Sequence, residues 1–135
     1  MVMLDDVATY LEANSTRFNR SNLTRSFMPD SPSTVTTLYD TGGAAPIHFF
    51  STGATRAYEQ PSLMVHSRST DYQTVRANIR AVWAILDSVS NQTLPTATGT
   101  HYVDVSANQS PFALTRDAND RFVMSVNFSV VKSTA

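Results

Sequence analysis

The sequence predicts an α+β fold: a mixed or antiparallel sheet of about five strands with a long amphipathic helix and a short N-terminal helix packed on one face. Three observations indicate this class. A buried strand runs directly into an amphipathic helix, other short segments alternate apolar and polar residues, and the strand connections near both chain ends are short. The length of 135 residues and the 41% hydrophobic content suit a single domain, residues 1–135.

The clearest signal lies between Ser62 and Ser90. Its first residues alternate as in a strand, and its later apolar residues follow the 3.6-residue period of a helix. Thr70 and Gln73 have the spacing of a capping box, which places Asp71 at the first helical position, where its negative charge suits the helix dipole. We therefore expect a long helix from about Asp71, with an apolar stripe made by Val75, Ile79, Val82, Trp83, Leu86 and Val89.

A second, shorter helix is expected over residues 3–13. Its apolar residues recur at helical spacing, and Asp5 and Asp6 fall in its first turn. A helix this short is not stable alone, so it must pack on its own sheet or on a neighbouring subunit.

Alternating segments predict the remaining strands. Residues 23–27 and 35–39 alternate on either side of a proline-bounded turn, as in an antiparallel sheet with one covered face. Residues 103–107 form another strand after a loop at 90–100. The last strand, 122–131, follows the turn at 117–120 and is expected to be central, because its alternate residues are large and apolar: Phe122, Met124, Val126, Phe128 and Val130.

A long loop or arm is expected at about residues 41–61, since glycines and prolines interrupt the pattern there. It contains apolar and aromatic residues that require covering. Two interpretations stay open: the segment is an arm that packs on a partner, or Ile47 to Phe50 form an extra short strand within the subunit. The candidate contact residues for a partner are Gly42, Gly43, Ile47, Phe49, Phe50, Arg56 and Tyr58, with Arg68 and Tyr72 at the strand-to-helix junction.

Charge and cysteine content exclude several classes of function. Ten basic and 11 acidic residues give a net charge of -1, which argues against sequence-independent nucleic-acid binding. The absence of cysteine excludes disulfides and thiolate chemistry. The N-terminal residues lack the features of a secretion signal, and no apolar run reaches the length of a membrane span, so we expect no membrane association.

No catalytic motif is visible. His48, His66 and His101 have no metal-ligand spacing, Gly42 and Gly43 do not belong to a phosphate-binding loop, and no nucleophile elbow is present. We therefore expect no enzyme, no catalytic residues, no cofactor and no metal. A small hydrolase or metal-binding enzyme that uses these histidines with nearby acids is the alternative from another class.

Five segments resemble, in the same order, the minor capsid or tail terminator (tail completion) proteins of long-tailed bacteriophages. The resemblance runs from about Met3 to Val131. It is carried by PDSP at 29–32, LYDTGG at 38–43, YEQP at 58–61, Ser67 and Arg68 with Tyr72, and the stretch 109–130. No family motif matches residues 48–56, so a contact role for that part rests on its own residues.

The resemblance implies a structural virion protein in the tail or neck region, assembled in the host cytoplasm. It implies a homo-oligomer, a hexameric ring at the head-proximal end of the tail tube, which stops tube polymerisation and joins the tail to the head. Its implied partners are the tail tube protein and a head completion or connector protein. Genomic DNA would pass through the lumen without specific binding, which suits a near-neutral chain. Alternative structural roles are a head completion or connector protein and the tail tube subunit itself.

Overall fold

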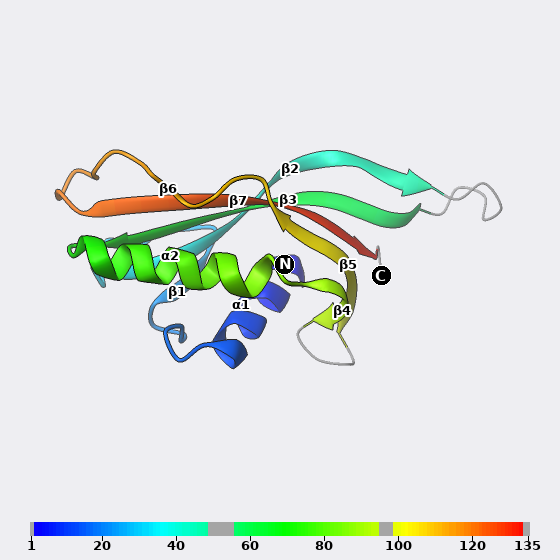
Figure 1. Ribbon diagram of the computed structural model, residues 1–135, viewed down its shortest axis with the longest axis horizontal. Coiled ribbons are helices and arrows are strands. Elements are labelled where there is room, and N and C mark those ends of the chain that lie inside the picture. Colours follow the sequence, from blue (N-terminus) through cyan, green and yellow to red (C-terminus); the bar gives the residue numbers. More distant parts are fainter. Residues whose placement is uncertain (1, 49–55, 95–98, 134–135) are drawn as a thin grey trace.

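A computed structural model, which describes residues 2–48, 56–94 and 99–133, shows a mixed α+β fold. Two helices lie on one side of a sheet of seven strands, more than the five expected (Figure 1). The elements in chain order are α1 (Val2–Asn14), β1 (Leu23–Arg25), β2 (Val35–His48), β3 (Arg56–Ser69), α2 (Tyr72–Leu86), β4 (Ser90–Leu94), β5 (Thr100–Ala107), β6 (Phe112–Ala113) and β7 (Phe122–Ser133).

The strand β7 lies at the centre of the sheet, as predicted. The strand order is β1-β2-β3-β7-β5-β4, and β6 pairs with β7 beside the segment that β5 leaves free. The pairing of β1 with β2 is parallel and all other pairings are antiparallel. The antiparallel relation expected for the first two strands was therefore wrong, because residues 26–34 run back along the sheet before β2 begins.

The helix α2 differs from its prediction at both ends. It has 15 residues and ends at Leu86, so it is not long. Asp71 is the N-cap and not the first helical residue, because its Oδ2 accepts hydrogen bonds from the backbone N of Thr74 at 3.2 Å and from the Thr74 hydroxyl at 2.7 Å. Four residues of the predicted stripe are confirmed as the buried side of the helix: Val75, Ile79, Val82 and Leu86. Trp83 is only partly buried, and Val89 is buried but lies beyond the end of the helix.

Two short strands were missed. The strand β4 lies in the segment expected to be a loop, and it pairs with β5 through residues such as Gln92 and Leu94. Its sequence, SNQTL, is polar apart from the buried Leu94, so no alternation marked it. The two-residue strand β6 is too short to give any pattern.

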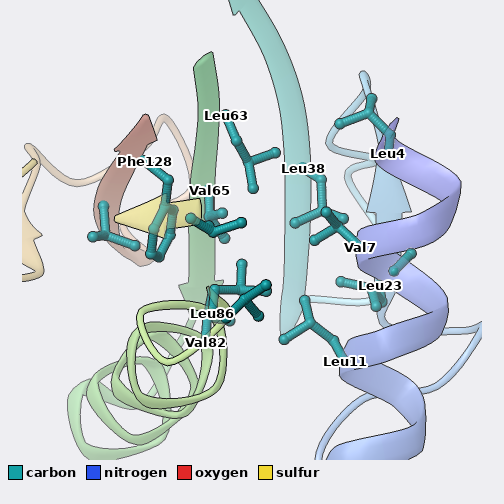
Figure 2. Close-up of a cluster of buried hydrophobic side chains, with 14 of the residues drawn as sticks. Leu4, Val7, Leu11, Leu23, Leu38, Leu63, Val65, Val82, Leu86 and Phe128 are labelled. Atoms are coloured by element: carbon teal, nitrogen blue, oxygen red, sulfur yellow. The ribbon is translucent and has the colours of Figure 1, made fainter. Parts of the chain in front are cut away.

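The core lies between the sheet and the two helices (Figure 2). The apolar side of α1 packs on the β1–β2 end of the sheet, where Leu4, Val7 and Leu11 surround Leu23 and Leu38. The first of the two supports considered for this helix, its own sheet, is therefore the one present. The α2 side chains cover β3 and β7, with Val82 and Leu86 over Val65 and Phe128.

A buried hydrogen bond also connects α1 to β5, near the opposite end of the strand order from β1 and β2. The hydroxyl of Tyr102 on β5 donates to Asp6 Oδ2 at 2.9 Å, and both side chains are buried. Burial raises the pKa of Asp6, although the hydrogen bond from Tyr102 and the charge of Lys132 act in the opposite direction. The same burial raises the pKa of Tyr102.

The variant Asp6→Asn tests this contact through its pH dependence. The folded state holds the Asp6 proton more tightly than the unfolded chain, so its contribution to the free energy of unfolding falls as pH rises from about 4 through the raised pKa. Asparagine can still accept from Tyr102 but does not titrate. Urea unfolding should therefore show wild-type stability, relative to Asp6→Asn, decreasing between pH 3 and neutrality; a difference independent of pH would contradict this.

The variant Tyr102→Phe removes the donor of the same hydrogen bond. It should lower the free energy of unfolding by about 1–3 kcal/mol, measured by urea unfolding.

Candidate functional site

The distal halves of β2 and β3 form a projecting hairpin, which we call the hairpin arm (residues 41–48 and 56–61). At its base, Tyr58 and Glu59 of β3 also pair with the end of β7. Figure 1 shows it extending past both helices. Its strands pair at Thr41 with Ser62, Ala44 with Gln60 and Ile47 with Tyr58, with register shifts between these pairs. The predicted long loop is therefore mostly strand. Its two glycines and two prolines lie at the register shifts, and these residues are the ones that resembled loop signals.

The open alternatives for this segment are resolved only in part. Ile47 lies in a strand of its own subunit, as the second interpretation expected, but this strand is the end of the long β2 and not an extra short one. Phe49 and Phe50 lie outside the described residues. For Arg56 the structure gives its backbone pairing with His48. Contact of the arm with a partner stays a prediction.

The two glycines of the arm have different surroundings. A Cβ added to Gly43 would lie 1.9 Å from the carbonyl oxygen of Gln60 and 2.8 Å from backbone atoms of Pro61, whereas one added to Gly42 meets nothing within 4 Å. The Gln60 side chain also crosses the hairpin, where its Nε2 donates to the carbonyl of Ala45 at 2.7 Å. The close approach of the two strands therefore depends on Gly43 having no side chain.

The outer edge of the arm is open and uncharged. The strand β1 pairs with β2 only from Thr36 to Leu38, and beyond that point no described strand pairs with this edge of β2, whose other edge pairs with β3. Residues 42–47 are exposed and carry no charged side chain, and Ile47 is 37% exposed. Tyr58 is half-buried opposite it. Edge strands of this kind are pairing sites for other chains, so the arm has the properties of a protein contact surface.

Arg68 does not belong to that surface. Its side chain is 3% exposed, and its guanidinium donates to the carbonyls of Pro29 at 2.6 Å, Pro32 at 2.8 Å and Ser33 at 3.1 Å. Burial lowers its pKa. The expectation that Arg68 contacts the next subunit is not supported, because its donors are used within its own chain.

Tyr72 lies with Arg68 at the end of β3 opposite the arm. It is 41% exposed, and its ring packs edge-to-face on Phe122 at 5.6 Å between centroids. The structure therefore separates the predicted contact residues into two groups, the arm residues and the strand-to-helix junction. Sequence reasoning also missed an exposed aromatic residue, Phe27, because it lies just beyond the end of β1 and continued the alternation of that strand.

The described residues offer little for chemistry. They contain no group of three or more metal-ligating His, Cys, Asp or Glu side chains. His66 packs edge-to-face on Tyr39, with ring centroids 5.2 Å apart, and burial lowers its pKa. No helix within these residues has the length and apolarity required to cross a bilayer.

Comparison with known proteins decides the family. Residues 10–134 match the family described as bacteriophage tail terminator protein. The chain belongs to the bacteriophage tail terminator family. This confirms the resemblance found in the sequence, and it makes the protein a structural component of the phage tail.

Solved structures share the fold of this tail terminator at low sequence identity. One, described as the virion of a native gene transfer agent (GTA) particle, matches with a TM-score of 0.66 and 13% identity, over 98% of this chain and 95% of that chain. Another, without a functional description, matches with a TM-score of 0.55 and 15% identity, over 99% of this chain and 92% of that chain. No curated protein matches significantly.

Substitution of the two glycines tests the packing of the arm. Gly43→Ala should clash with the backbone of Gln60 and Pro61 and lower the local stability of the arm by about 1–3 kcal/mol. Amide hydrogen exchange in residues 41–48 and 56–61 should then accelerate about tenfold or more, while exchange in residues 122–128 of β7, which do not pair with the arm, stays unchanged. Gly42→Ala is the matched control, because its added methyl group meets only solvent. Equal exchange in the two variants would contradict this account of Gly43.

Proposed function

We propose that this tail terminator forms a homo-oligomeric ring, a hexamer, at the head-proximal end of the tail tube. There it stops tube polymerisation and provides the surface to which a head completion or connector protein binds. The observation that carries the proposal is the family match over residues 10–134. The similarity to a chain of a gene transfer agent virion supports it.

The hairpin arm supplies the contact that a ring requires. Each subunit of a closed ring presents one patch that meets a different patch on its neighbour. The arm projects from the subunit, exposes an uncharged strand edge and carries Ile47 opposite Tyr58. We propose that the arm residues Gly42, Gly43, Ile47, Arg56 and Tyr58, with Phe49 and Phe50, contact a neighbouring subunit or the tube.

The distribution of cations supports passage of DNA without binding. Several basic side chains are paired within the subunit and are therefore less able to bind phosphate. Arg121 pairs with Asp30 and Asp117, Lys132 pairs with Glu59, and Arg68 donates to backbone carbonyls. Since affinity for DNA grows with the number of phosphates neutralised, a net charge of -1 favours transit over retention.

A structural role without catalysis completes the proposal. The tail terminator family is structural. Of the three histidines considered for an enzyme, His66 is half-buried against the Tyr39 ring, and burial lowers its pKa. Metal analysis of the purified protein tests this part, and stoichiometric zinc or manganese would revive the enzyme alternative.

Electron microscopy of particles made without this protein tests the assignment. Overlong headless tubes support the terminator role, because nothing then halts tube growth. Tailless filled heads with normal tails would instead identify a head connector. Light scattering of the purified protein mixed with tail tube protein provides a second test, in which a terminator caps tubes and a tube subunit polymerises into open-ended ones.

The variant Ile47→Asp tests the arm as a contact surface. The side chain is 37% exposed, so a carboxylate there leaves the domain folded but introduces an unpaired charge into the proposed contact. Capping of tubes should fall more than tenfold, with an unchanged circular dichroism spectrum. Thr16→Asp, an exposed change on the helix side of the molecule, is the control and should cap normally.

The double change of Phe49 and Phe50 to Ser should have the same effect as Ile47→Asp. Loss of folding would instead place these two side chains in the subunit core.

A further inference from the structure

We infer that Lys132 is a positioning residue, which fixes the direction of the hairpin arm relative to helix α1. This role rests on the proposed function, in which the arm contacts a neighbouring subunit or the tube, and it identifies the interaction that holds the arm in place for that contact. Two observations support it: the strand pairing at the base of the arm, and a row of charged and polar side chains that runs from the arm to α1.

Beyond its own two strands, the arm has lateral support on one side only. No described strand pairs with its β2 edge, so the support comes from β7 through β3. The described pairs between β3 and β7 are interrupted at Gln60 and Pro61 and resume where Glu59 pairs with Lys132 and Tyr58 with Ser133. Proline has no backbone N–H to donate to a neighbouring strand. The base of the arm is therefore held at the end of β7 (Figure 1).

Lys132 provides a side-chain interaction at this point. Its Nζ donates to Glu59 Oε1 at 3.0 Å and to the carbonyl of Ser133 at 3.2 Å. The Lys132 side chain is 9% exposed, whereas that of Glu59 is 45% exposed. An ion pair between two exposed groups contributes little, but a buried cation that loses its partner is strongly unfavourable. Movement of Glu59 away from Lys132 would leave such a cation, so the pair resists displacement of the arm.

The same lysine lies beside the contact between α1 and β5. Lys132 is directly opposite Glu59 on one neighbouring strand and directly opposite Tyr102 on the other. Directly opposite residues of antiparallel strands lie on the same face of a sheet. The hydroxyl of Tyr102 donates to Asp6 Oδ2 at 2.9 Å, so this is the face that the helices cover. Glu59, Lys132, Tyr102 and Asp6 therefore form one row, which we call the polar row.

Charge connects the two ends of the polar row. Burial raises the pKa of Asp6, and the charge of Lys132 acts on that pKa in the opposite direction. Lys132 therefore interacts with two carboxylates, Asp6 on α1 and Glu59 on the arm. Because both Lys132 and Asp6 are buried, neither can move into water without losing these interactions. The arm carboxylate is thus held at a position that α1 and β7 determine together.

A fixed arm suits the contact proposed for it. A ring closes only when each subunit presents its patch to the next one at a constant angle. An element that is already fixed before binding also loses less conformational entropy when it binds. Lys132 acts through the arm and does not itself have to touch the neighbour. Its removal should therefore weaken assembly although every contact residue of the arm is still present.

The distance between the arm and α1 tests this role in the purified protein. The natural chain has no cysteine, so Ala13→Cys/Ala45→Cys carries one spin label on α1 and one on the arm, both at exposed positions. Pulsed electron paramagnetic resonance should give a narrow distance distribution, which broadens or shifts when Lys132→Met is added. Arg25→Gln is the matched control and should change nothing, because it removes a cation that pairs with Asp5 of α1 at 2.7 Å, away from the arm.

An unchanged distribution in Lys132→Met would overturn the inference. If that variant does not fold, Glu59→Ala tests the same ion pair from its half-exposed side. It should also broaden or shift the distribution, and an unchanged distribution there would equally overturn the inference.

Tube capping tests whether the position of the arm matters for assembly. Lys132→Met should cap tubes about tenfold less well or worse, with an unchanged circular dichroism spectrum, whereas Arg25→Gln should cap normally. Normal capping by a variant in which the distance has changed would overturn the positioning role and leave the proposed function intact. Wild-type protein that never caps tubes would instead overturn the proposed function, and the spin-label distances would still decide whether Lys132 fixes the arm.

Discussion

The one-sided burial of β7 is the constraint on which the rest of the structure depends. Val126, Phe128 and Val130 are buried beneath the helices, and β7 hydrogen-bonds to β3 on one edge and to β5 and β6 on the other. Because a strand turns alternate side chains to opposite faces, this burial fixes the register of its neighbours. Both helices must then lie on the same face. The proposed contact surface lies at an end and an edge of the sheet, beyond this core.

The two ends of β2 and β3 have different physical characters. At one end the strands leave the core and continue as the hairpin arm, in which the absence of a Gly43 side chain permits the close backbone approach. At the other end, two buried arginines replace apolar packing with hydrogen bonds to the 26–34 loop. Each buried cation has several acceptors, and such pairing is what makes its burial tolerable. A projecting strand edge and a braced loop are thus built from the same pair of strands.

For a tail terminator, this arrangement separates stability from assembly. The contact proposed for the hairpin arm uses the open edge of β2, and the core residues take no part in it. On the proposed function, a subunit folds before it associates with its neighbours or with the tube. The near balance of 10 basic and 11 acidic residues, several of them paired within the subunit, leaves little attraction for DNA, in keeping with the ring proposed above.

The sequence by itself determined the α+β class, both helices, the central place of β7 and the family, because these depend on periodic apolar residues and on motifs that survive in order. Only the tertiary structure decided the parallel pairing of β1, the polar strand β4, the strand character of the arm and the internal use of Arg68. Each of these depends on partners distant in the chain: β4 is defined by β5, Gly43 by Gln60, and Arg68 by the carbonyls of the 26–34 loop. Local pattern carries no information about such partners, which is why the arm resembled a loop and Arg68 resembled a free surface cation.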